Sequence, residues 1–272
     1  MIPLNVKCLI RTPPPVVDKD QSLSLVLDMM EKHGLGSIGV VDDGKPVGIV
    51  SLKNVLNRIW SERVRSVSLN NLYVSSAMES TPLASSSISI LDACKLMVEK
   101  RISALPILED DELLGMLFEE DIPRLLLDWD SKDYSFLLDE LISVKPSDSL
   151  LHARMLMLRK DLQILPVTSE NYKFIGVISD WNIIKVIRIV QEKVSYKYKD
   201  TRMRNLFVSD AFTPSPPTLT GNPSIAEISR TLLSSNLRGI VILDEERKVK
   251  MIIQLRDMPR ILIRRGKTVG NC

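Results

Sequence analysis

The chain has 272 residues, of which 44% are hydrophobic and 26% are charged, and its formal net charge is +2. This is the balance of an ordinary globular protein, which excludes a disordered chain and a small scaffold held together by disulfides. The small net charge gives no general attraction to DNA or to an acidic membrane. The three cysteines lie far apart and form no CxxC pair. We therefore expect a reducing compartment and no structural zinc site.

One plan of secondary structure recurs four times along the chain. Each copy has a helix with apolar residues at helical spacing, then two short β-type runs joined by a polar or acidic turn, then a second helix. With a short β-segment in front, the economical interpretation is a βαββα unit and an α+β fold. The copies span residues 12–59, 78–127, 139–190 and 212–263.

A serine stands before the first helix of every copy, where its hydroxyl can cap the helix by accepting a backbone N–H. Seventeen residues after each serine comes the residue that we expect to open the first strand of the hairpin. The closing helix should begin at an Asn or Asp suited to capping. The serines are Ser22, Ser89, Ser149 and Ser224; the strand residues are Gly39, Pro106, Pro166 and Val241; the closing helices should start at Asn54, Asp121, Asn182 and Asp257.

A unit of about 50 residues leaves apolar surface uncovered, so such units should associate in pairs. We expect the first pair to occupy residues 1–128, with copies 12–59 and 78–127. The second pair should occupy residues 129–272, with copies 139–190 and 212–263. The expected architecture is therefore two pseudo-two-fold pairs packed as a compact disc.

Two stretches carry a resemblance to a known family: Arg101–Ile107, with the sequence RISALPI, and Gly48–Asn54, with the sequence GIVSLKN. They are similar to the cystathionine beta-synthase (CBS) motif, and four copies resemble the plan of the gamma subunit of AMP-activated protein kinase. The resemblance implies a regulatory sensor module that binds adenine nucleotides in clefts between paired repeats and alters partner or subunit docking. It leaves the ligand open among AMP, ADP, ATP, S-adenosylmethionine and none.

The family signature G-h-x-[ST]-x-x-[DN] implies which residues hold the ribose. The hydroxyl and the Asp or Asn would bond the 2′- and 3′-hydroxyls, as short acceptors at a helix start can. The second copy departs from the signature with Phe118 at the hydroxyl position, and the fourth departs with Met251 and Gln254. The matching residues are Gly48, Ser51 and Asn54 in copy one, Gly176, Ser179 and Asn182 in copy three, Gly115 and Asp121 in copy two, and Asp257 in copy four.

The resemblance also implies an adenine contact from a polar residue six positions before the first-helix serine, and a phosphate contact from a basic residue before the first strand. Only the second pair offers both kinds of residue. Ser143 and Thr218 are the candidates for the adenine contact, and Arg238 is the candidate for the phosphate contact, because its planar guanidinium suits phosphate oxygens. We therefore expect two nucleotide clefts in the second pair. One would combine Ser143, Arg238 and Asp257, and the other Thr218, Ser179 and Asn182; Ser51 and Asn54 are the candidates of the first pair.

The sequence gives little support for catalysis. His33 and His152 are the only histidines, and neither has a candidate nucleophile or second metal ligand nearby in sequence. Neither a P-loop nor a G-x-G-x-x-G fingerprint occurs. We expect no enzymatic activity, no metal site and no required cofactor. Charges interrupt the apolar stretches before the ~18 residues that a membrane span needs, which predicts a soluble, cytoplasmic protein without membrane association.

Two other functions are consistent with the sequence. One is an S-adenosylmethionine sensor. The other is a ligand-free interaction scaffold or nucleic-acid-associated protein, because alternating Lys and Tyr can follow a phosphate backbone and stack on bases. A regulated protein partner and a homodimer are further expectations. The residues behind the nucleic-acid interpretation are Lys193, Lys197, Lys199, Arg202 and Arg204 with Tyr196 and Tyr198, and Arg264, Arg265 and Lys267 near the C-terminus.

Overall fold

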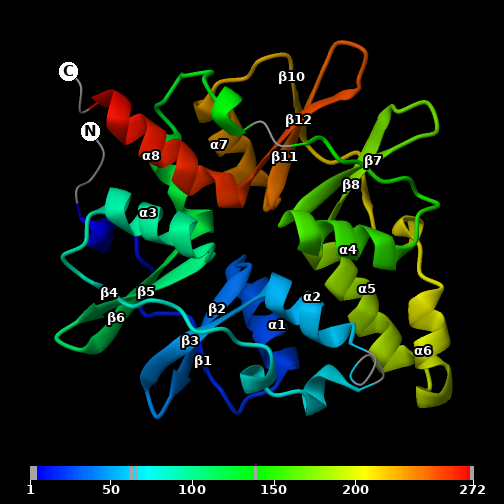
Figure 1. Ribbon diagram of the computed structural model, residues 1–272, viewed down its shortest axis with the longest axis horizontal. Coiled ribbons are helices and arrows are strands. Elements are labelled where there is room, and N and C mark those ends of the chain that lie inside the picture. The colour runs from blue at the N-terminus through cyan, green and yellow to red at the C-terminus, as the bar shows by residue number, and fades with distance from the viewer. Residues whose placement is uncertain (1–4, 62–63, 65–66, 138–139, 270–272) are drawn as a thin grey trace. The chain divides into compact units, whose positions relative to one another are not determined.

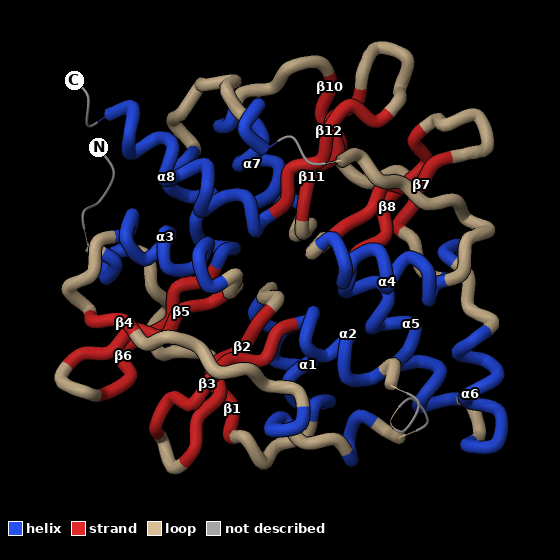
Figure 2. The backbone as a smooth tube through the Cα atoms, viewed as in Figure 1, coloured by secondary structure: helices blue, strands red, loops and turns tan. Residues whose placement is uncertain are grey.

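The computed structural model describes residues 5–61, 64, 67–137 and 140–269. Within these residues the strands form four three-stranded sheets, one for each predicted repeat (Figure 1). Helical segments precede and follow each hairpin along the backbone (Figure 2). The four βαββα units and the α+β class predicted from the sequence are confirmed. Their arrangement as a disc stays a prediction.

Repeats one and two share the same element order. Repeat one has β1 (Val16–Asp18), α1 (Leu23–His33), β2 (Ser37–Asp42), β3 (Lys45–Ser51) and α2 (Leu52–Ile59). Repeat two has β4 (Ala84–Ser85), α3 (Ile90–Lys100), β5 (Ala104–Glu109), β6 (Glu112–Phe118) and the 3-10 helix η4 (Glu119–Leu126). In each sheet the first strand is parallel to the second, and the second and third form an antiparallel hairpin.

Repeats three and four keep the hairpin and its flanking helices. Repeat three has α4 (Leu150–Lys160), β7 (Ile164–Thr168), β8 (Phe174–Ser179) and α5 (Asp180–Lys193), which α6 (Tyr196–Arg204) and the short strand β9 (Thr213–Pro214) follow. Repeat four has β10 (Thr218–Thr220), α7 (Ile225–Ser235), β11 (Gly239–Leu243), β12 (Val249–Gln254), the 3-10 turn η7 (Leu255–Asp257) and α8 (Met258–Val269). The first strand of repeat three is reduced to a single parallel bridge between Val144 and Val167.

The four predicted serine caps are confirmed. Each serine has extended backbone geometry, and its hydroxyl accepts a hydrogen bond from the backbone N–H three residues ahead, which satisfies a donor that the helix cannot pair. At α7 the cap is a full capping box, because Glu227 returns its carboxylate to the Ser224 N–H at 2.7 Å. The first helix of every repeat thus begins with the same serine N-cap.

Three of the four predicted starts of the closing helices are wrong. These three helices begin earlier, at Leu52, Glu119 and Asp180, and the Asx residue lies inside the first turn. In repeat four, α8 begins at Met258, directly after Asp257, so the predicted start agrees to within one residue. At α5 the N-cap is Ser179, and Asn182 occupies the third helical position of a capping box. The hairpin strands likewise begin before the residues expected to open them, at Ser37, Ala104, Ile164 and Gly239.

One backbone hydrogen bond recurs in all four repeats and joins the closing segment to the residue that precedes the hairpin. The bonds measure 2.9 to 3.1 Å and run from Leu52 N to Gly36 O, Glu119 N to Ser103 O, Asp180 N to Gln163 O and Leu255 N to Arg238 O. This bond fixes the signature helix start beside the loop before the first hairpin strand, so the two predicted ligand-binding segments of each repeat are neighbours.

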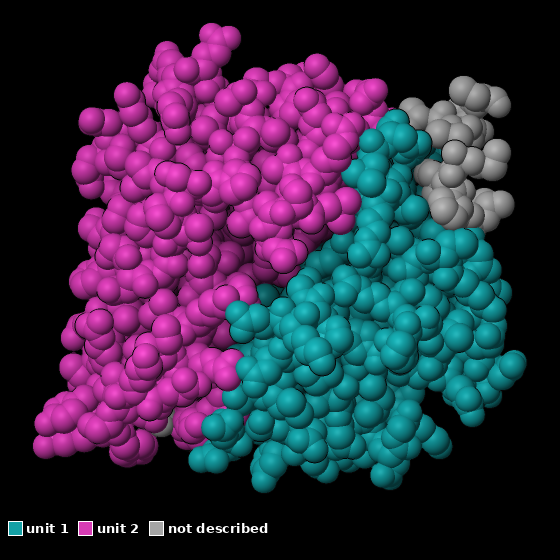
Figure 3. Space-filling model, turned by 180° about the vertical axis from the view of Figure 1, so that it is seen from behind, with its two compact units in different colours: residues 1–54, 70–128, 256–272 teal, residues 55–69, 129–255 magenta. Residues whose placement is uncertain are grey.

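The chain divides into two compact units, which Figure 3 colours separately. Unit 1 contains residues 1–54, 70–128 and 256–272, and unit 2 contains residues 55–69 and 129–255. Each unit therefore includes a closing-helix segment from a distant part of the sequence. In unit 1, α8 packs on α3 and η4. In unit 2, Arg154 of α4 donates to Leu56 O at 2.9 Å. The expected grouping into residues 1–128 and 129–272 stays a prediction.

The core of each unit is built from the apolar faces of the helices and the hairpin strands. Leu23, Val26 and Met30 of α1 are almost completely buried, as are Ile183 and Ile187 of α5. Burial of such side chains contributes about 1.5–3 kcal/mol each, which makes this packing the main support of the small sheets. No helix of the described ranges is long and apolar enough to span a membrane.

Candidate functional site

A short extended segment crosses the second hairpin strand of three repeats, next to the signature glycine. The crossing residues pair antiparallel with that strand: Glu79 with Ile49, Arg11 with Met116, and Thr213 with Val177. The register is the same in all three cases, because each partner directly follows the signature glycine.

The signature glycine is needed for this crossing. A Cβ at Gly48 would lie 2.3 Å from the backbone oxygen of Glu79, and one at Gly176 would lie 2.4 Å from that of Thr213. At Gly115 the distance to the Arg11 oxygen would be 2.9 Å. Only glycine allows two backbones to approach so closely. The glycine therefore places the side chain at the crossing position beside the start of the closing helix.

Repeat three gathers three polar side chains at the start of α5. Asn182 Oδ1 accepts from the Ser179 N–H at 2.9 Å and from the Ser179 hydroxyl at 2.7 Å. At the other end of the amide, Asn182 Nδ2 donates to Thr213 Oγ1 at 3.1 Å. All three residues are half-buried. They form a polar cluster, partly open to solvent, that offers both donors and acceptors to a hydroxyl-bearing ligand.

Repeat one has the same capping geometry as repeat three but lacks a counterpart of the Thr213 hydroxyl. Asn54 Oδ1 accepts from the Ser51 N–H at 2.9 Å, and the Asn54 N–H donates to the Ser51 hydroxyl at 3.2 Å. Ser51 is buried and Asn54 is half-buried. The crossing residue here is Glu79, which is exposed and acidic. A carboxylate at this position would repel a nucleotide phosphate, so repeat one is a poorer candidate than repeat three.

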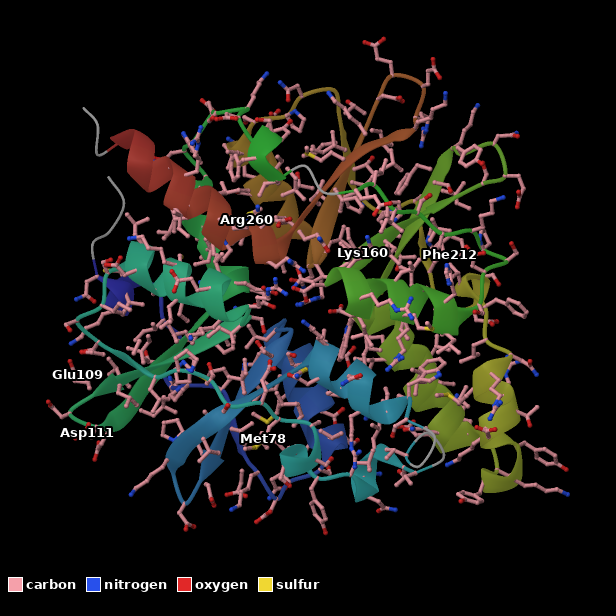
Figure 4. The ribbon with its side chains drawn as sticks, in the orientation of Figure 1. Met78, Glu109, Asp111, Lys160, Phe212 and Arg260 are labelled. Atoms are coloured by element: carbon pink, nitrogen blue, oxygen red, sulfur yellow. The ribbon has the colours of Figure 1, made fainter. Side chains whose placement is uncertain are left out.

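Repeat two has a carboxylate at the Asx position, and it is already engaged. Asp121 is completely buried, and its oxygens lie 3.1 Å from Nε of Arg11 and 3.0 Å from Nη2 of the same guanidinium. The guanidinium also lies over the Phe118 ring, 5.5 Å from its centroid. The hairpin of this repeat ends in the acidic turn that contains Glu109 and Asp111, labelled in Figure 4.

Repeat four departs most from the signature. Gln254 replaces the hydroxyl residue and is buried, and its Oε1 accepts from the backbone of Gln163 at 2.6 Å and of Ile164 at 3.3 Å. Met251 replaces the glycine and, with Leu141 among others, lines a small pocket. The methionine takes the space that the signature glycines of the other repeats leave for a crossing backbone.

Asp257 is buried in unit 1, where the guanidinium of Arg260 lies 3.8 Å from its carboxylate. Ser143 and Arg238 belong to unit 2. The expected cleft of Ser143, Arg238 and Asp257 thus draws on both units and stays a prediction. Figure 4 labels Arg260, which lies on α8.

Arg238 precedes β11 at the place predicted for a phosphate ligand, and it forms an ion pair within the protein. Its Nε lies 3.1 Å from Oδ1 of Asp180, and the two side chains are only 11% and 6% exposed. Asp180 Oδ1 also accepts from the Trp181 N–H at 2.8 Å. The ion pair links the first turn of α5 to the loop before β11, so Arg238 and the Ser179–Asn182 box are held on the same part of unit 2.

The two residues predicted to contact adenine lie on or near the first-strand positions. Thr218 opens β10 opposite Val241 and is half-buried. Ser143 is exposed, and its hydroxyl accepts from Thr168 at 3.4 Å. An adenine contact by either residue stays a prediction.

Sequence reasoning missed Thr213, the crossing residue that touches Asn182. The available signal was a Thr-Pro dipeptide that lies near the start of three of the copies, at Thr12-Pro13, Thr81-Pro82 and Thr213-Pro214. Proline favours extended backbone in the residue before it, as a crossing strand requires.

Within the described residues, no group of three or more His, Cys, Asp or Glu side chains is arranged to hold a metal ion.

The sequence matches a known domain family over more than half of its length. The profile of the CBS domain matches residues 6–61, 74–128 and 133–189. The fourth repeat lies outside these matches, although its strands and helices follow the same order. In this repeat Met251 and Gln254 stand in place of two signature residues.

One solved structure is similar over nearly the whole chain. The crystal structure of protein MJ1225 from Methanocaldococcus jannaschii, described as a proposed archaeal homolog of g-AMPK, aligns with 95% of this chain and 100% of that one. The TM-score is 0.80 and the sequence identity is 19%. At this identity the similarity establishes the fold, which is that of a four-repeat protein, and leaves the ligand to be tested.

Relatives of other kinds match shorter parts of the chain. Homoserine O-acetyltransferase of Methanosalsum zhilinae is 32% identical over 122 residues, which cover 44% of this chain and 25% of that enzyme. The structure of CBSX2 in complex with AMP aligns with 47% of this chain at 26% identity and a TM-score of 0.39. The chain spans only 33%, 25% and 61% of the length of three curated relatives that it matches.

Proposed function

We propose that this chain, which belongs to the CBS domain family, is a regulatory module that binds an adenine nucleotide at repeat three and thereby alters how a partner or a subunit docks. The ligand would be AMP, ADP or ATP. The observation that carries the proposal is the cluster of Ser179, Asn182 and Thr213, three half-buried polar side chains at one helix start. Each ribose hydroxyl both donates and accepts, and the cluster offers complementary groups.

The role of each residue follows from its chemistry. The Asn182 amide would exchange its contact with Thr213 for a ribose hydroxyl, while Ser179 keeps the capping box intact. Thr218 would reach the adenine. Arg238, which the sequence assigned to the cleft of Ser143 and Asp257, would instead meet the phosphate at this site, because its ion pair with Asp180 holds it beside the start of α5. A guanidinium has five N–H donors and can serve both Asp180 and a phosphate oxygen. The ion pair with Asp180 would hold the guanidinium in place before the ligand arrives, which lowers the entropic cost of binding.

Coupling to a partner requires two arrangements of the chain with different affinities for the nucleotide. Repeat three is suited to such coupling because Ser179, Asn182 and Thr213 come from two distant segments, the start of α5 and strand β9. A ligand that binds both segments favours the arrangement that keeps them together.

The first experiment is a thermal-shift panel on the purified chain with AMP, ADP, ATP, S-adenosylmethionine and GTP at millimolar concentration. A ligand at about 100 times its Kd stabilises the native state by ~2.7 kcal/mol, which raises the unfolding midpoint by roughly 5–10 °C for a chain of this size. A shift with AMP, ADP or ATP supports the proposal. A shift with S-adenosylmethionine alone would transfer the site to that ligand, and flat curves from a folded protein would contradict nucleotide binding.

A matched pair of variants separates binding from capping. Asn182→Ala removes a capping-box residue and the proposed ribose contact, whereas Glu227→Ala removes the equivalent residue of the box at α7. Both should lower stability by about 0.5–2 kcal/mol. Only Asn182→Ala should also weaken the nucleotide, by about tenfold for a lost hydrogen bond of ~1.4 kcal/mol. Equal affinities in the two variants would contradict the assignment of Asn182.

A second candidate function, nucleic-acid binding, rests on helix α6. Tyr196 and Tyr198 on this helix are 75% and 57% exposed, and the Lys197 ammonium lies 5.5 Å from the ring centroid of Tyr198. Exposed aromatic rings among basic side chains can stack on bases and follow a phosphate backbone. This function predicts affinity for single-stranded DNA that falls steeply with salt and is lost in a Tyr196→Ala, Tyr198→Ala variant.

A further inference from the structure

The carboxylate of Asp121 occupies the same position in repeat two as the amide of Asn182 in repeat three, and it already has a ligand from the chain itself. Asp121 is completely buried. The Arg11 guanidinium contacts both of its oxygens from Nε at 3.1 Å and one of them from Nη2 at 3.0 Å. A second arginine, Arg124, lies 3.3 Å from the carboxylate and is 55% exposed. The carboxylate is thus neutralised inside the unit.

Arg11 is held by contacts of both its backbone and its side chain. Its backbone pairs with Met116 in β6 through hydrogen bonds of 2.8 and 3.3 Å. Its Nη1 donates to His33 O, the last carbonyl of α1, at 3.0 Å, where a cation is favoured by the helix dipole. Its guanidinium lies over the Phe118 ring. These contacts fix the side chain over Asp121 rather than in solvent, and it is only 25% exposed.

The crossing register makes the comparison with repeat three direct. Arg11 and Thr213 are both crossing residues, and each pairs with the residue that directly follows the signature glycine. Phe118 occupies the position that Ser179 has in repeat three. A short threonine leaves room above the Asx side chain, whereas a long arginine fills that room with a cation. The guanidinium of Arg11 makes several charge-assisted hydrogen bonds to the buried Asp121 carboxylate. These bonds are stronger than the hydrogen bond that a neutral ribose hydroxyl could form with the same carboxylate.

We propose that Arg11 is an internal occupant of the repeat-two site, so that this repeat excludes nucleotide and Arg11 determines which repeats of the chain can bind it. The proposal rests on the proposed function, because it concerns where a nucleotide goes. A ligand that displaced Arg11 would leave Asp121 buried beside Arg124 alone, and would also remove the cap on α1. The occupant is therefore held more firmly than a competing hydroxyl group.

The test counts the nucleotides bound per chain, by calorimetry with AMP, in the full-length protein and three variants. Arg11→Thr, Phe118→Ser installs the residues of repeat three in repeat two. Asp121→Asn removes the carboxylate while Arg11 stays in place. Arg124→Ala removes the outer arginine of the same carboxylate and is the matched control.

We expect the Arg11→Thr, Phe118→Ser variant to bind one more AMP than the wild type, with Asp121→Asn and Arg124→Ala unchanged in number and affinity. An unchanged number in a folded double variant overturns the proposal. So does a loss of one AMP in Asp121→Asn, because that result would mean that the carboxylate binds nucleotide in the wild type. If the double variant does not fold, Asp121→Asn decides alone.

The outcomes also separate this proposal from the proposed function. A wild type that binds no AMP, ADP or ATP contradicts nucleotide binding at repeat three. The double variant then still decides the role of Arg11: one bound AMP supports it, and none overturns it. Retained binding in the wild type with no gain in the double variant rejects Arg11 as the occupant and leaves repeat three intact.

Discussion

Arg265, on the last helix, holds Asp128 at the end of repeat two through two hydrogen bonds, from Nη1 at 2.8 Å and from Nη2 at 3.0 Å. Nη1 also donates to Leu125 O at 2.6 Å. The guanidinium holds the pKa of the Asp128 carboxyl below its usual value, chiefly through these hydrogen bonds. The arginine side chain is only 10% exposed, so it joins α8 to unit 1 as part of the packed structure.

Replacing Arg265 by alanine should destabilise unit 1 by about 1–3 kcal/mol, because the Leu125 carbonyl loses a donor and the buried stem of the arginine loses its packing. Chemical denaturation followed by circular dichroism measures the change. Arg264→Ala, one residue earlier on the exposed face, is the control and should stay within about 0.5 kcal/mol of the wild type. Equal effects of the two variants would reject Arg265 as an anchor.

Gly176→Ala should destabilise unit 2 by about 1–3 kcal/mol, the usual cost of forcing an extra methyl group into a packed position. Its Cβ would lie 2.4 Å from the Thr213 oxygen and 2.6 Å from the ring of Phe212, which Figure 4 labels. Because the crossing segment must shift, Thr213 should also lose its contact with Asn182, and nucleotide affinity should fall with stability.

The control for Gly176→Ala is Gly221→Ala. Gly221 has a φ of +74° and no atom within 4 Å of its added Cβ, so alanine there meets backbone strain but no clash. This variant should lose some stability, about 1 kcal/mol, and keep the wild-type affinity for nucleotide. A Gly176→Ala protein with unchanged affinity would separate the crossing segment from the site.

The sequence was sufficient to predict the repeats because their local signals are strong and independent. Each serine cap acts within three residues, and the hairpin runs alternate with acidic turns, so neither depends on the rest of the fold. The fourth repeat was found this way although it lies outside the family matches. Helix α6 lies between the third and fourth copies and was not predicted, since its Lys and Tyr residues show no apolar periodicity.

The site was predicted less completely because its geometry depends on contacts between distant segments. Ser179 and Asn182 were found from a signature seven residues long. Thr213 contacts Asn182 from 31 positions away, and Arg11 contacts Asp121 from 110 positions away. No local pattern links such pairs. From the sequence, Phe118 marks repeat two as a departure from the signature, but only the pairing of Arg11 with Met116 shows that Arg11 lies beside Asp121.

Cys94 and Cys8 should differ sharply in reactivity. Cys94 is buried in α3, and burial raises the pKa of its thiol to about 12, so almost no thiolate is present at neutral pH. Cys8 is exposed. Iodoacetamide at pH 8 should therefore modify Cys8 quickly in the native protein and Cys94 only after unfolding, as peptide mass spectrometry would show. A Cys8→Ser variant is the control, and rapid native labelling of Cys94 would contradict its burial.

Stability should fall as the solution becomes acidic, because five carboxyls within the described part of the chain have pKa values held below their usual range. For Glu227 the main causes are hydrogen bonds from the Ser224 backbone and hydroxyl, and for Asp92 they are hydrogen bonds from Lys95 and Ser89. A folded pKa below the unfolded value favours the folded state above the unfolded pKa, and the benefit is lost as the pH falls through the folded pKa. The others are Glu109, Asp128 and Glu140.

The unfolding midpoint should therefore stay nearly constant from pH 7 to about pH 5 and fall below about pH 4.5, where the unfolded carboxyls begin to bind protons. Glu227→Gln keeps an oxygen that can accept the Ser224 N–H but cannot titrate, so its midpoint should fall less steeply between pH 5 and pH 3. Glu245→Gln, on the exposed turn between β11 and β12, should follow the wild-type curve. A Glu227→Gln curve parallel to the wild type would mean that this capping carboxylate contributes nothing to the acid sensitivity.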